Sequence, residues 1–265
     1  MIIFVVIFIN KKGQEMTQTT VINKINDLKY KGFKEAYLRQ IEDVNYHSLT
    51  FEDRLYNLLD SEAIFLQNKR IIMNTRLSRI KDKEAMVEEL DYNSKRNLNK
   101  TQILAFITMD FLRAKQNIII TGKTGTGKSY LAQALGNRAI IEGFTVYYIR
   151  TATLLEDIKV ARIDGTYTNL IKKFARYKLL IIDDFGVSPI STDDTSNLFE
   201  IIESRSELNS TIITSQLPVK KWYEYLNNDT VADALLDRVV STSHRVELTG
   251  ESMRKIKSKI DRNYE

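Results

Sequence analysis

The feature that most constrains this chain is a glycine-rich stretch at residues 122–129, which spells G-x-x-x-x-G-K-S. A short apolar run at residues 118–121 precedes it, and a helical pattern that includes Leu131 and Leu135 follows it. A strand, such a loop and a helix in this order form a phosphate-binding loop, in which backbone N–H groups and the positive end of the helix face the phosphates. We therefore predict a nucleotide-binding domain built on an α/β sheet.

The residues of this stretch have separate expected roles. Lys128 is expected to reach the β- and γ-phosphates of ATP, and the Ser129 hydroxyl is expected to complete the coordination shell of Mg²⁺. Glycines let the backbone approach the phosphates because they lack a Cβ atom. The predicted ATP-contacting residues are Gly122, Lys123, Thr124, Gly125, Thr126, Gly127, Lys128, Ser129 and Tyr130.

A second motif lies at residues 177–186, where four apolar residues lead into Asp183 and Asp184. Open α/β sheets bind ligands at the carboxyl ends of their strands. We expect Asp183 to hold Mg²⁺ through water, and Asp184 to orient and deprotonate the attacking water. The alternative is a surface Asp-Asp turn after a core strand. Many such ATPases carry Asp-Glu here, so the shorter Asp184 leads to the hypothesis of slow or partner-dependent turnover.

The strand expected at residues 211–214 also ends in polar residues, Thr214, Ser215 and Gln216. This strand would lie beside the one that carries Asp183, so a polar group at its tip could contact the γ-phosphate. An ordinary polar strand end is the alternative.

Two arginines, Arg238 and Arg254, lie beyond these motifs. An arginine that one subunit supplies to the γ-phosphate bound by its neighbour raises the rate by about 10³ to 10⁵. Arg238 is a candidate for that role. The alternative is a helix residue that forms a salt bridge with Asp233 or Asp237.

The order of the predicted elements indicates a doubly wound, mostly parallel five-stranded sheet flanked by helices. Strands are expected near residues 118–121, 145–150, 179–183, 211–214 and 245–248. Residues 101–265 would form this ATPase domain, which begins with a helix at about 100–112. The pattern of residues 16–90 predicts a small all-helical domain that binds DNA or a partner, and Gly32 is a candidate for a break in its first helical stretch. Residues 91–100 are predicted to form a linker. Residues 1–15 are expected to be a mis-started extension, since Met16 offers a second start.

Composition narrows the choice of partners. The net charge of +5 and the pI near 9.1 weakly favour a polyanionic partner. The absence of cysteine excludes disulfides and Cys/His zinc sites and agrees with an expected cytoplasmic location. The apolar run at residues 1–9 is far shorter than the roughly 20 residues that a membrane helix needs, so no membrane association is expected.

Two groups of basic residues are candidates for DNA contact, although a merely solvated basic surface is the alternative. The first comprises Lys69, Arg70, Arg76, Arg79 and Lys83, of which the last three could share one helical face. The second lies between the second and third strands and comprises Lys159, Arg162, Lys172 and Lys173. If DNA is the partner, the absence of a visible base-reading signature predicts largely sequence-independent, salt-sensitive binding. The aromatic residues Tyr147, Tyr148 and Trp222 are assigned to the core rather than to base stacking.

Taken together, the motifs GKTGTGKSYLA, LLIIDDFG, TIITSQLP, LLDRVV and GESMRK resemble those of the IstB-like ATP-binding proteins. These proteins are ATPase helpers of insertion-sequence transposases, in the branch of the AAA+ class that includes the DnaC-type helicase loaders. The resemblance covers residues 16–257. It implies an AAA+ ATPase that uses ATP and Mg²⁺ and forms a ring or helical homo-oligomer on double-stranded DNA. It also implies a cognate transposase, which the ATPase assists in target selection and transposition, with turnover stimulated by DNA and self-assembly.

The resemblance also implies roles for single residues. Arg238 would be the finger that acts on a neighbouring subunit, and Arg254 the sensor within its own subunit. Gln216 would lie near the first sensor, with Ser215 or Thr214 as alternatives. The nearest rival function is a DnaC-like replicative helicase loader, which shares every nucleotide motif. A small-molecule kinase and a nucleotide-gated binding module that hardly hydrolyses ATP are further alternatives.

Overall fold

The computed structural model describes residues 17–92 and 96–253. The extension expected at residues 1–15 lies outside these ranges. Contacts within the chain define two compact units, one ending at Arg70 and the other beginning at Ile71.

The first unit is helical, in agreement with the prediction for this region. It contains α1 (Gln18–Asp27), α2 (Lys31–Glu42), the 3₁₀ helix η1 (Val44–Ser48) and most of α3 (Phe51–Leu77). The break expected at Gly32 is wrong, because the helices separate at residues 28–30, where Lys29 has φ 61°. Gly32 instead lies inside α2, where an added Cβ would meet the Ser61 carbonyl oxygen of α3 at 2.4 Å. Its lack of a side chain permits the close packing of α2 on α3.

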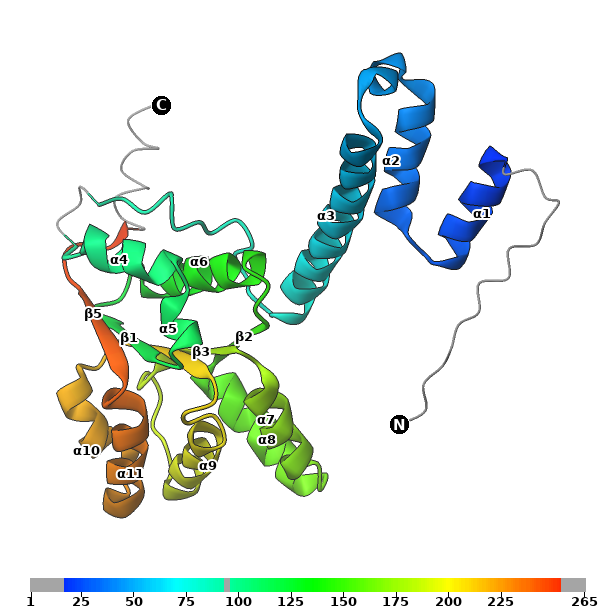
Figure 1. Cartoon of the computed structure of the whole chain (residues 1–265). Helices are drawn as coiled ribbons and strands as arrows, with labels where there is room; N and C mark the ends of the chain where they lie inside the picture. Colours follow the sequence, from blue (N-terminus) through cyan, green and yellow to red (C-terminus); the bar gives the residue numbers. More distant parts are fainter. Residues whose placement is uncertain (1–16, 93–95, 254–265) are drawn as a thin grey trace, which may run out of the picture. The chain divides into compact units, whose positions relative to one another are not determined.

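The second unit contains a five-stranded, fully parallel sheet with the order β2-β3-β4-β1-β5 (Figure 1). The strands are β1 (Asn117–Gly122), β2 (Val146–Arg150), β3 (Leu179–Phe185), β4 (Ser210–Ser215) and β5 (Ser243–Leu248). All five strands predicted from the sequence are confirmed. The strand order places β4 between β1 and β3, so the ends of these three strands meet at one edge of the sheet.

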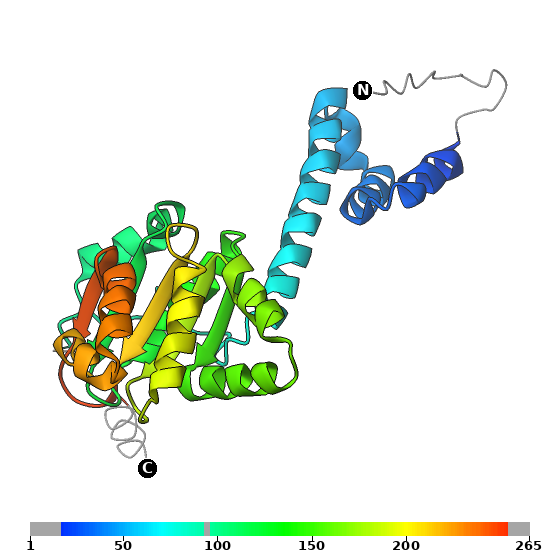
Figure 2. The ribbon, with the colours of Figure 1, turned by 90° about the horizontal axis from the view of Figure 1, so that it is seen from below.

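Helices cover both faces of this sheet (Figures 1 and 2). One face carries α4 (Lys100–Ile107) and α6 (Lys128–Ile141), and α5 (Asp110–Arg113) joins the same apolar cluster. The other face carries α7 (Thr151–Ile163), α8 (Tyr167–Arg176), α9 (Thr192–Glu203), α10 (Trp222–Leu226) and α11 (Asp229–Val240), with the short η2 (Val219–Lys221) before α10. Strands β1 to β4 therefore have apolar residues on both sides, as expected of a parallel sheet, whereas the edge strand β5 buries Val246 and Leu248 on one face only.

The structure corrects the sequence prediction in two further places. The single helix expected at residues 100–112 is two helices, α4 and α5, separated at the buried Met109, which has φ 60°. The domain boundary expected near residue 90 falls at Arg70 instead. The segment after α3 belongs to the second unit because Ile80, Ala85 and Val87 are buried in the core beside α6. None of the helices in the described ranges has the length and apolarity needed to cross a bilayer.

Candidate active site

The predicted phosphate-binding loop connects β1 to α6 at the carboxyl edge of the sheet. Gly122 has φ 151°, and an added Cβ would lie 2.3 Å from the Leu248 carbonyl oxygen of β5, so only glycine fits there. Gly127 is the N-cap of α6 with φ 94°, which turns the chain so that the first N–H groups of the helix open toward the loop. The loop therefore has the backbone geometry of an anion site.

Lys128 lies at the centre of this loop. Its Nζ donates to the carbonyl oxygens of Gly122 at 2.7 Å and Lys123 at 2.9 Å. Burial lowers the pKa of Lys128, while the nearby carboxylates of Asp183 and Asp184 oppose that shift. The ammonium group is thus held between the loop carbonyls and two acidic side chains, where a polyphosphate would add negative charge.

Asp183 is the most buried acidic side chain of the site, with 1% exposure. Its Oδ1 accepts hydrogen bonds from Ser129 Oγ at 2.9 Å and from Thr214 Oγ1, and its Oδ2 accepts one from the Tyr148 hydroxyl. The structure thus brings Ser129 and Asp183 together as the sequence analysis expects. Tyr148 is buried in the core as predicted, but its bond to Asp183 was missed.

Asp184 faces the pocket because β3 is irregular at this point. The β3–β4 register shifts between Ile182 and Phe185, and Asp184 has φ 59°. This bulge turns two adjacent carboxylates toward one edge of the sheet. Asp184 Oδ2 lies 3.6 Å from Arg150 Nε, and its backbone N–H donates to Thr214 Oγ1 at 3.2 Å.

The three candidate sensors have different surroundings. Gln216 Oε1 accepts from Thr124 Oγ1 at 2.7 Å, and Gln216 lines the pocket beside the loop. Thr214 bonds to Asp183, whereas the buried Ser215 donates to the Phe185 carbonyl oxygen at 2.7 Å. Gln216 is therefore the candidate with access to a bound phosphate.

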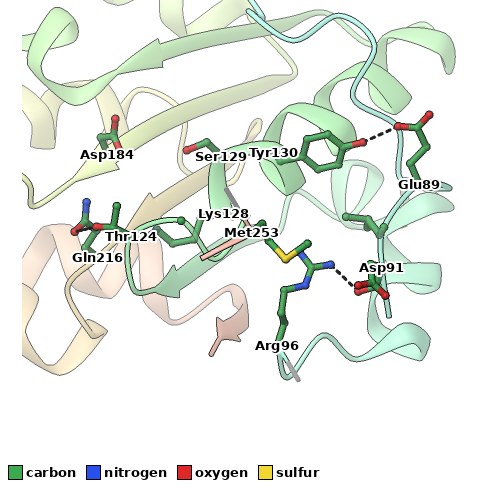
Figure 3. A pocket seen from close by; sticks show the side chains of 13 residues that line it. Glu89, Asp91, Arg96, Thr124, Lys128, Ser129, Tyr130, Asp184, Gln216 and Met253 are labelled. Carbon is green, nitrogen blue, oxygen red and sulfur yellow. Dashed lines mark hydrogen bonds between the residues drawn. The ribbon is translucent and has the colours of Figure 1, made fainter. Parts of the chain in front are cut away.

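A pocket of about 360 Å³ extends from the loop (Figure 3). Its volume lies in the range of small-molecule sites. Its lining residues are Glu89, Leu90, Asp91, Arg96, Thr124, Gly125, Gly127, Lys128, Ser129, Tyr130, Asp184, Gln216 and Met253. Three of the residues predicted to contact ATP do not line the pocket, namely Gly122, Lys123 and Thr126. Thr126 is buried and its hydroxyl donates to the Lys123 carbonyl oxygen at 2.9 Å, so it shapes the loop.

One side of the pocket was missed by the sequence analysis, which assigned residues 91–100 to a linker. The Tyr130 hydroxyl donates to Glu89 Oε2 at 3.0 Å, and Arg96 donates to the Asp91 carbonyl oxygen at 2.6 Å (Figure 3). This mixed apolar and polar wall lies next to the phosphate loop. The polar composition of the segment gave no signal of this packing.

Arg238 lies at the opposite edge of the sheet. Its carbonyl oxygen accepts from Asn117 Nδ2 at 3.4 Å, so it is beside the first residue of β1, whereas the loop follows the last. At about 3.3 Å per residue, the strand separates the two by roughly 17 Å. The guanidinium pairs with Glu203 at 2.9 Å and Asp237 at 3.0 Å, so one of the two salt bridges considered from the sequence forms.

The side chain of Arg238 borders a polar cavity of about 600 Å³ at that edge, together with Lys115 and the buried Arg205. Arg254, the second predicted arginine, lies outside the described residues. The described chain ends at Met253, whose backbone N–H donates to the Gly125 carbonyl oxygen of the loop at 2.9 Å.

The first group of predicted DNA contacts needs a correction. Because α3 ends at Leu77, Arg76, Arg79 and Lys83 do not share a helical face. Arg79 has φ 57° and its guanidinium lies 5.3 Å from the centre of the Tyr147 ring. Lys69 and Arg70 are exposed on α3.

The second group lies on α7 and α8. Lys159 pairs with Asp194 at 3.4 Å, and Arg162 donates to Asn197 Oδ1 at 2.8 Å. Lys172 and Lys173 line a cavity of about 510 Å³ with Arg176. Lys172 and Lys173 of the second group thus lie with a third cation, Arg176, around one cavity. Trp222 is fully buried, and with Tyr147 it belongs to the core as predicted.

The donor set at the loop fits Mg²⁺. The Ser129 hydroxyl and the Asp183 carboxylate offer oxygen atoms that could hold Mg²⁺ directly or through water, and Mg²⁺ in nucleotide sites is held by few protein oxygens together with substrate phosphates. No cluster of three or more His, Cys, Asp or Glu side chains that could hold a metal alone occurs within residues 17–92 and 96–253.

Comparisons with known proteins agree on the family and the fold. The model of the family described as IstB-like ATP binding protein matches residues 23–260. A putative insertion sequence ATP-binding protein of Sinorhizobium fredii is 36% identical over 234 residues, covering 88% of this chain and 95% of that protein. The putative ATP-binding protein of insertion sequence IS1162 from Pseudomonas fluorescens is 34% identical, covering 77% and 87%. The crystal structure of DnaI matches with a TM-score of 0.55 at 18% identity, covering 63% of this chain and 92% of that one.

Proposed function

The chain belongs to the IstB-like ATP-binding proteins, with an AAA+ fold, and from this premise we propose that it is an ATPase that assembles on duplex DNA and assists an insertion-sequence transposase. The observation that carries the proposal is the separation of Arg238 from the loop of its own chain. If Arg238 acts on a γ-phosphate, a second copy must bring it to the loop, because Arg238 and the loop of one chain lie at opposite edges of the sheet.

Within one subunit, the residues at the loop would bind and orient ATP. Lys128 and the loop N–H groups hold the phosphates, and Ser129 with Asp183 would hold Mg²⁺. Bound there, the metal supplies positive charge that offsets the charge developing on the phosphates. Asp184, which faces the pocket, accepts the proton of the attacking water, and Gln216 contacts the γ-phosphate.

Across subunits, Arg238 would leave Glu203 and Asp237 and reach the γ-phosphate of the neighbour. Both of its ion pairs are open to solvent, so each is weak and can be exchanged for another partner. Duplex DNA would contact basic residues of α7 and α8, above all Lys172 and Lys173, and would favour the assembled state. ATP hydrolysis then determines when the assembly is released.

The choice of a transposase as the partner rests on the relatives named for insertion sequences. The likeness to DnaI concerns the fold alone and does not favour a helicase loader. Pull-down with a transposase encoded beside this chain's gene, compared with a replicative helicase, separates the two partners.

The test of the proposal is the ATPase rate as a function of protein concentration, with and without duplex DNA, for the wild type and Arg238→Ala. We expect the wild-type rate to rise cooperatively with concentration and to increase on DNA. The variant should lose about 10³-fold or more in rate while it still binds ATP. Arg113→Ala, which removes a comparable surface ion pair with Asp110, is the matched control and should retain activity.

A rate strictly proportional to concentration and indifferent to DNA and to Arg238 would contradict the proposal. Such a result would favour chemistry on a small molecule within one subunit.

A further inference from the structure

The strand register brings Tyr148, a buried residue of β2, to the carboxylate of Asp183. Tyr148 pairs with Ile181, and Arg150 pairs with Asp183. Residues two apart on a strand share a face, so Tyr148 and Asp183 lie on the same face as diagonal neighbours, a spacing that a long side chain can span. The Tyr148 hydroxyl makes this contact by donating a hydrogen bond to Asp183 Oδ2.

The hydrogen bonds at Asp183 distinguish its two oxygens. Oδ1 accepts from Ser129 and Thr214, and Oδ2 accepts from Tyr148. Within the described residues no other hydrogen bond reaches Oδ2. Because Asp183 is 1% exposed, water has little access to replace the hydroxyl, and a buried carboxylate oxygen without a donor is destabilising.

The backbone of Tyr148 is fixed as firmly as its side chain. Its N–H donates to the Ser78 carbonyl oxygen at 2.7 Å, and its ring lies in the apolar cluster beside α6. The hydroxyl is therefore carried by a packed strand, which fixes its position more rigidly than a loop would.

We propose that Tyr148 is a positioning residue for the magnesium site. By donating to Oδ2 it keeps Asp183 in the orientation that directs Oδ1 at Ser129, and so fixes the two oxygen-bearing side chains that would hold Mg²⁺. The inference rests on the proposed ATPase function and adds a residue to it that touches neither metal nor substrate. Residues in this position behind a metal ligand typically change metal affinity by about 10- to 100-fold when replaced.

The test compares Tyr148→Phe with Tyr147→Phe in the full chain. Each variant removes one hydroxyl from a buried tyrosine of β2, but Tyr147 points to the other face, where its hydroxyl accepts from Lys173 Nζ at 3.1 Å. The measurement is the affinity for a fluorescent ATP analogue titrated with Mg²⁺, with thermal unfolding followed in parallel.

We expect the Mg²⁺ concentration at half-maximal effect to rise about tenfold or more in Tyr148→Phe, and to stay at the wild-type value in Tyr147→Phe. Affinity in the absence of Mg²⁺ should be the same in all three proteins. An unchanged Mg²⁺ dependence in Tyr148→Phe overturns the role of Tyr148 and leaves the ATPase proposal intact. A wild-type protein that does not bind the analogue contradicts the ATPase proposal itself.

A double-variant cycle separates positioning from general destabilisation. In an Asp183→Asn background, Tyr148→Phe should cause no further change in Mg²⁺ dependence, because the hydroxyl acts through Asp183. An effect that adds in full to that of Asp183→Asn shows a merely structural role and overturns the inference.

Discussion

At the scale of single residues, the chemistry of the site depends on the backbone of Asp184. A regular strand would point Asp183 and Asp184 to opposite faces of the sheet. The bulge in β3 and the left-handed conformation of Asp184, with φ 59°, turn both carboxylates to the nucleotide edge. Aspartate adopts the left-handed conformation more readily than most residues, which gives a physical reason why position 184 carries Asp and not the longer Glu. Such strained residues concentrate at functional sites.

Replacing Asp184 tests its assigned role as the base. Asp184→Asn keeps the size of the side chain but cannot accept the proton, so ATP hydrolysis should fall by about 10²- to 10⁴-fold while nucleotide binding persists. Phosphate release and analogue binding measure the two effects. Asp193→Asn, at an exposed position in the first turn of α9, is the control. A rate for Asp184→Asn within about twofold of wild type would show that another group activates the water.

The loop residues could be predicted from the sequence because their chemistry follows from spacing within one short stretch. The role of Tyr148 could not be predicted, since its hydrogen bond to Asp183 depends on which strands are neighbours and on their register. The expectation that a basic stretch near Arg79 forms one helical face failed for a related reason. The end of α3 at Leu77 depends on packing of the following segment against α6.

At the scale of elements, β1 to β4 could be predicted because each contains a short apolar run in a sheet covered on both faces, whereas β5, in which only Val246 and Leu248 are buried, has a weaker pattern. The positions at which helices end were harder to predict. The break at Met109 occurs at a buried apolar residue that carries no turn signal, and the residue that suggested a break, Gly32, is inside a helix. Glycine there serves close helix packing, which the sequence alone does not distinguish from a turn.

The packing of α2 on α3 leads to a stability prediction. Alanine at Gly32 would gain about 1 kcal/mol from helix propensity. The added Cβ would also lie 2.4 Å from the Ser61 carbonyl oxygen and 2.6 Å from Phe65 Cβ. Because a backbone atom cannot easily yield, we expect Gly32→Ala to lower the free energy of unfolding of the first unit by a net amount of about 1–3 kcal/mol.

Circular dichroism during heating measures this loss, and binding of an ATP analogue should persist because the second unit is unaltered. Glu35→Ala, at an exposed position of α2, is the control and should change stability by less than about 0.5 kcal/mol. A Gly32→Ala protein as stable as the control would mean that α2 and α3 do not pack as closely as described.

At the scale of the whole molecule, the ATPase unit has two different edges. The carboxyl edge holds Lys128 and Asp184, and the amino edge holds Arg238, paired with Glu203. Under the proposed function these edges are complementary surfaces on opposite sides of one unit, an arrangement that would give head-to-tail association into rings or helical filaments. In this account the ion pair with Glu203 keeps the arginine in place until a neighbour offers a stronger negative charge.

Mixing two inactive variants tests this account most directly. Lys128→Ala should lose its phosphate site and keep its arginine, and Arg238→Ala should do the reverse. In an equimolar mixture on duplex DNA, about one interface in four joins an intact loop to an intact Arg238, so ATPase activity should reappear at roughly a quarter of the wild-type rate. If the mixture is as inactive as either variant alone, Arg238 acts within its own chain or not at all, and the account of a site completed between subunits is wrong.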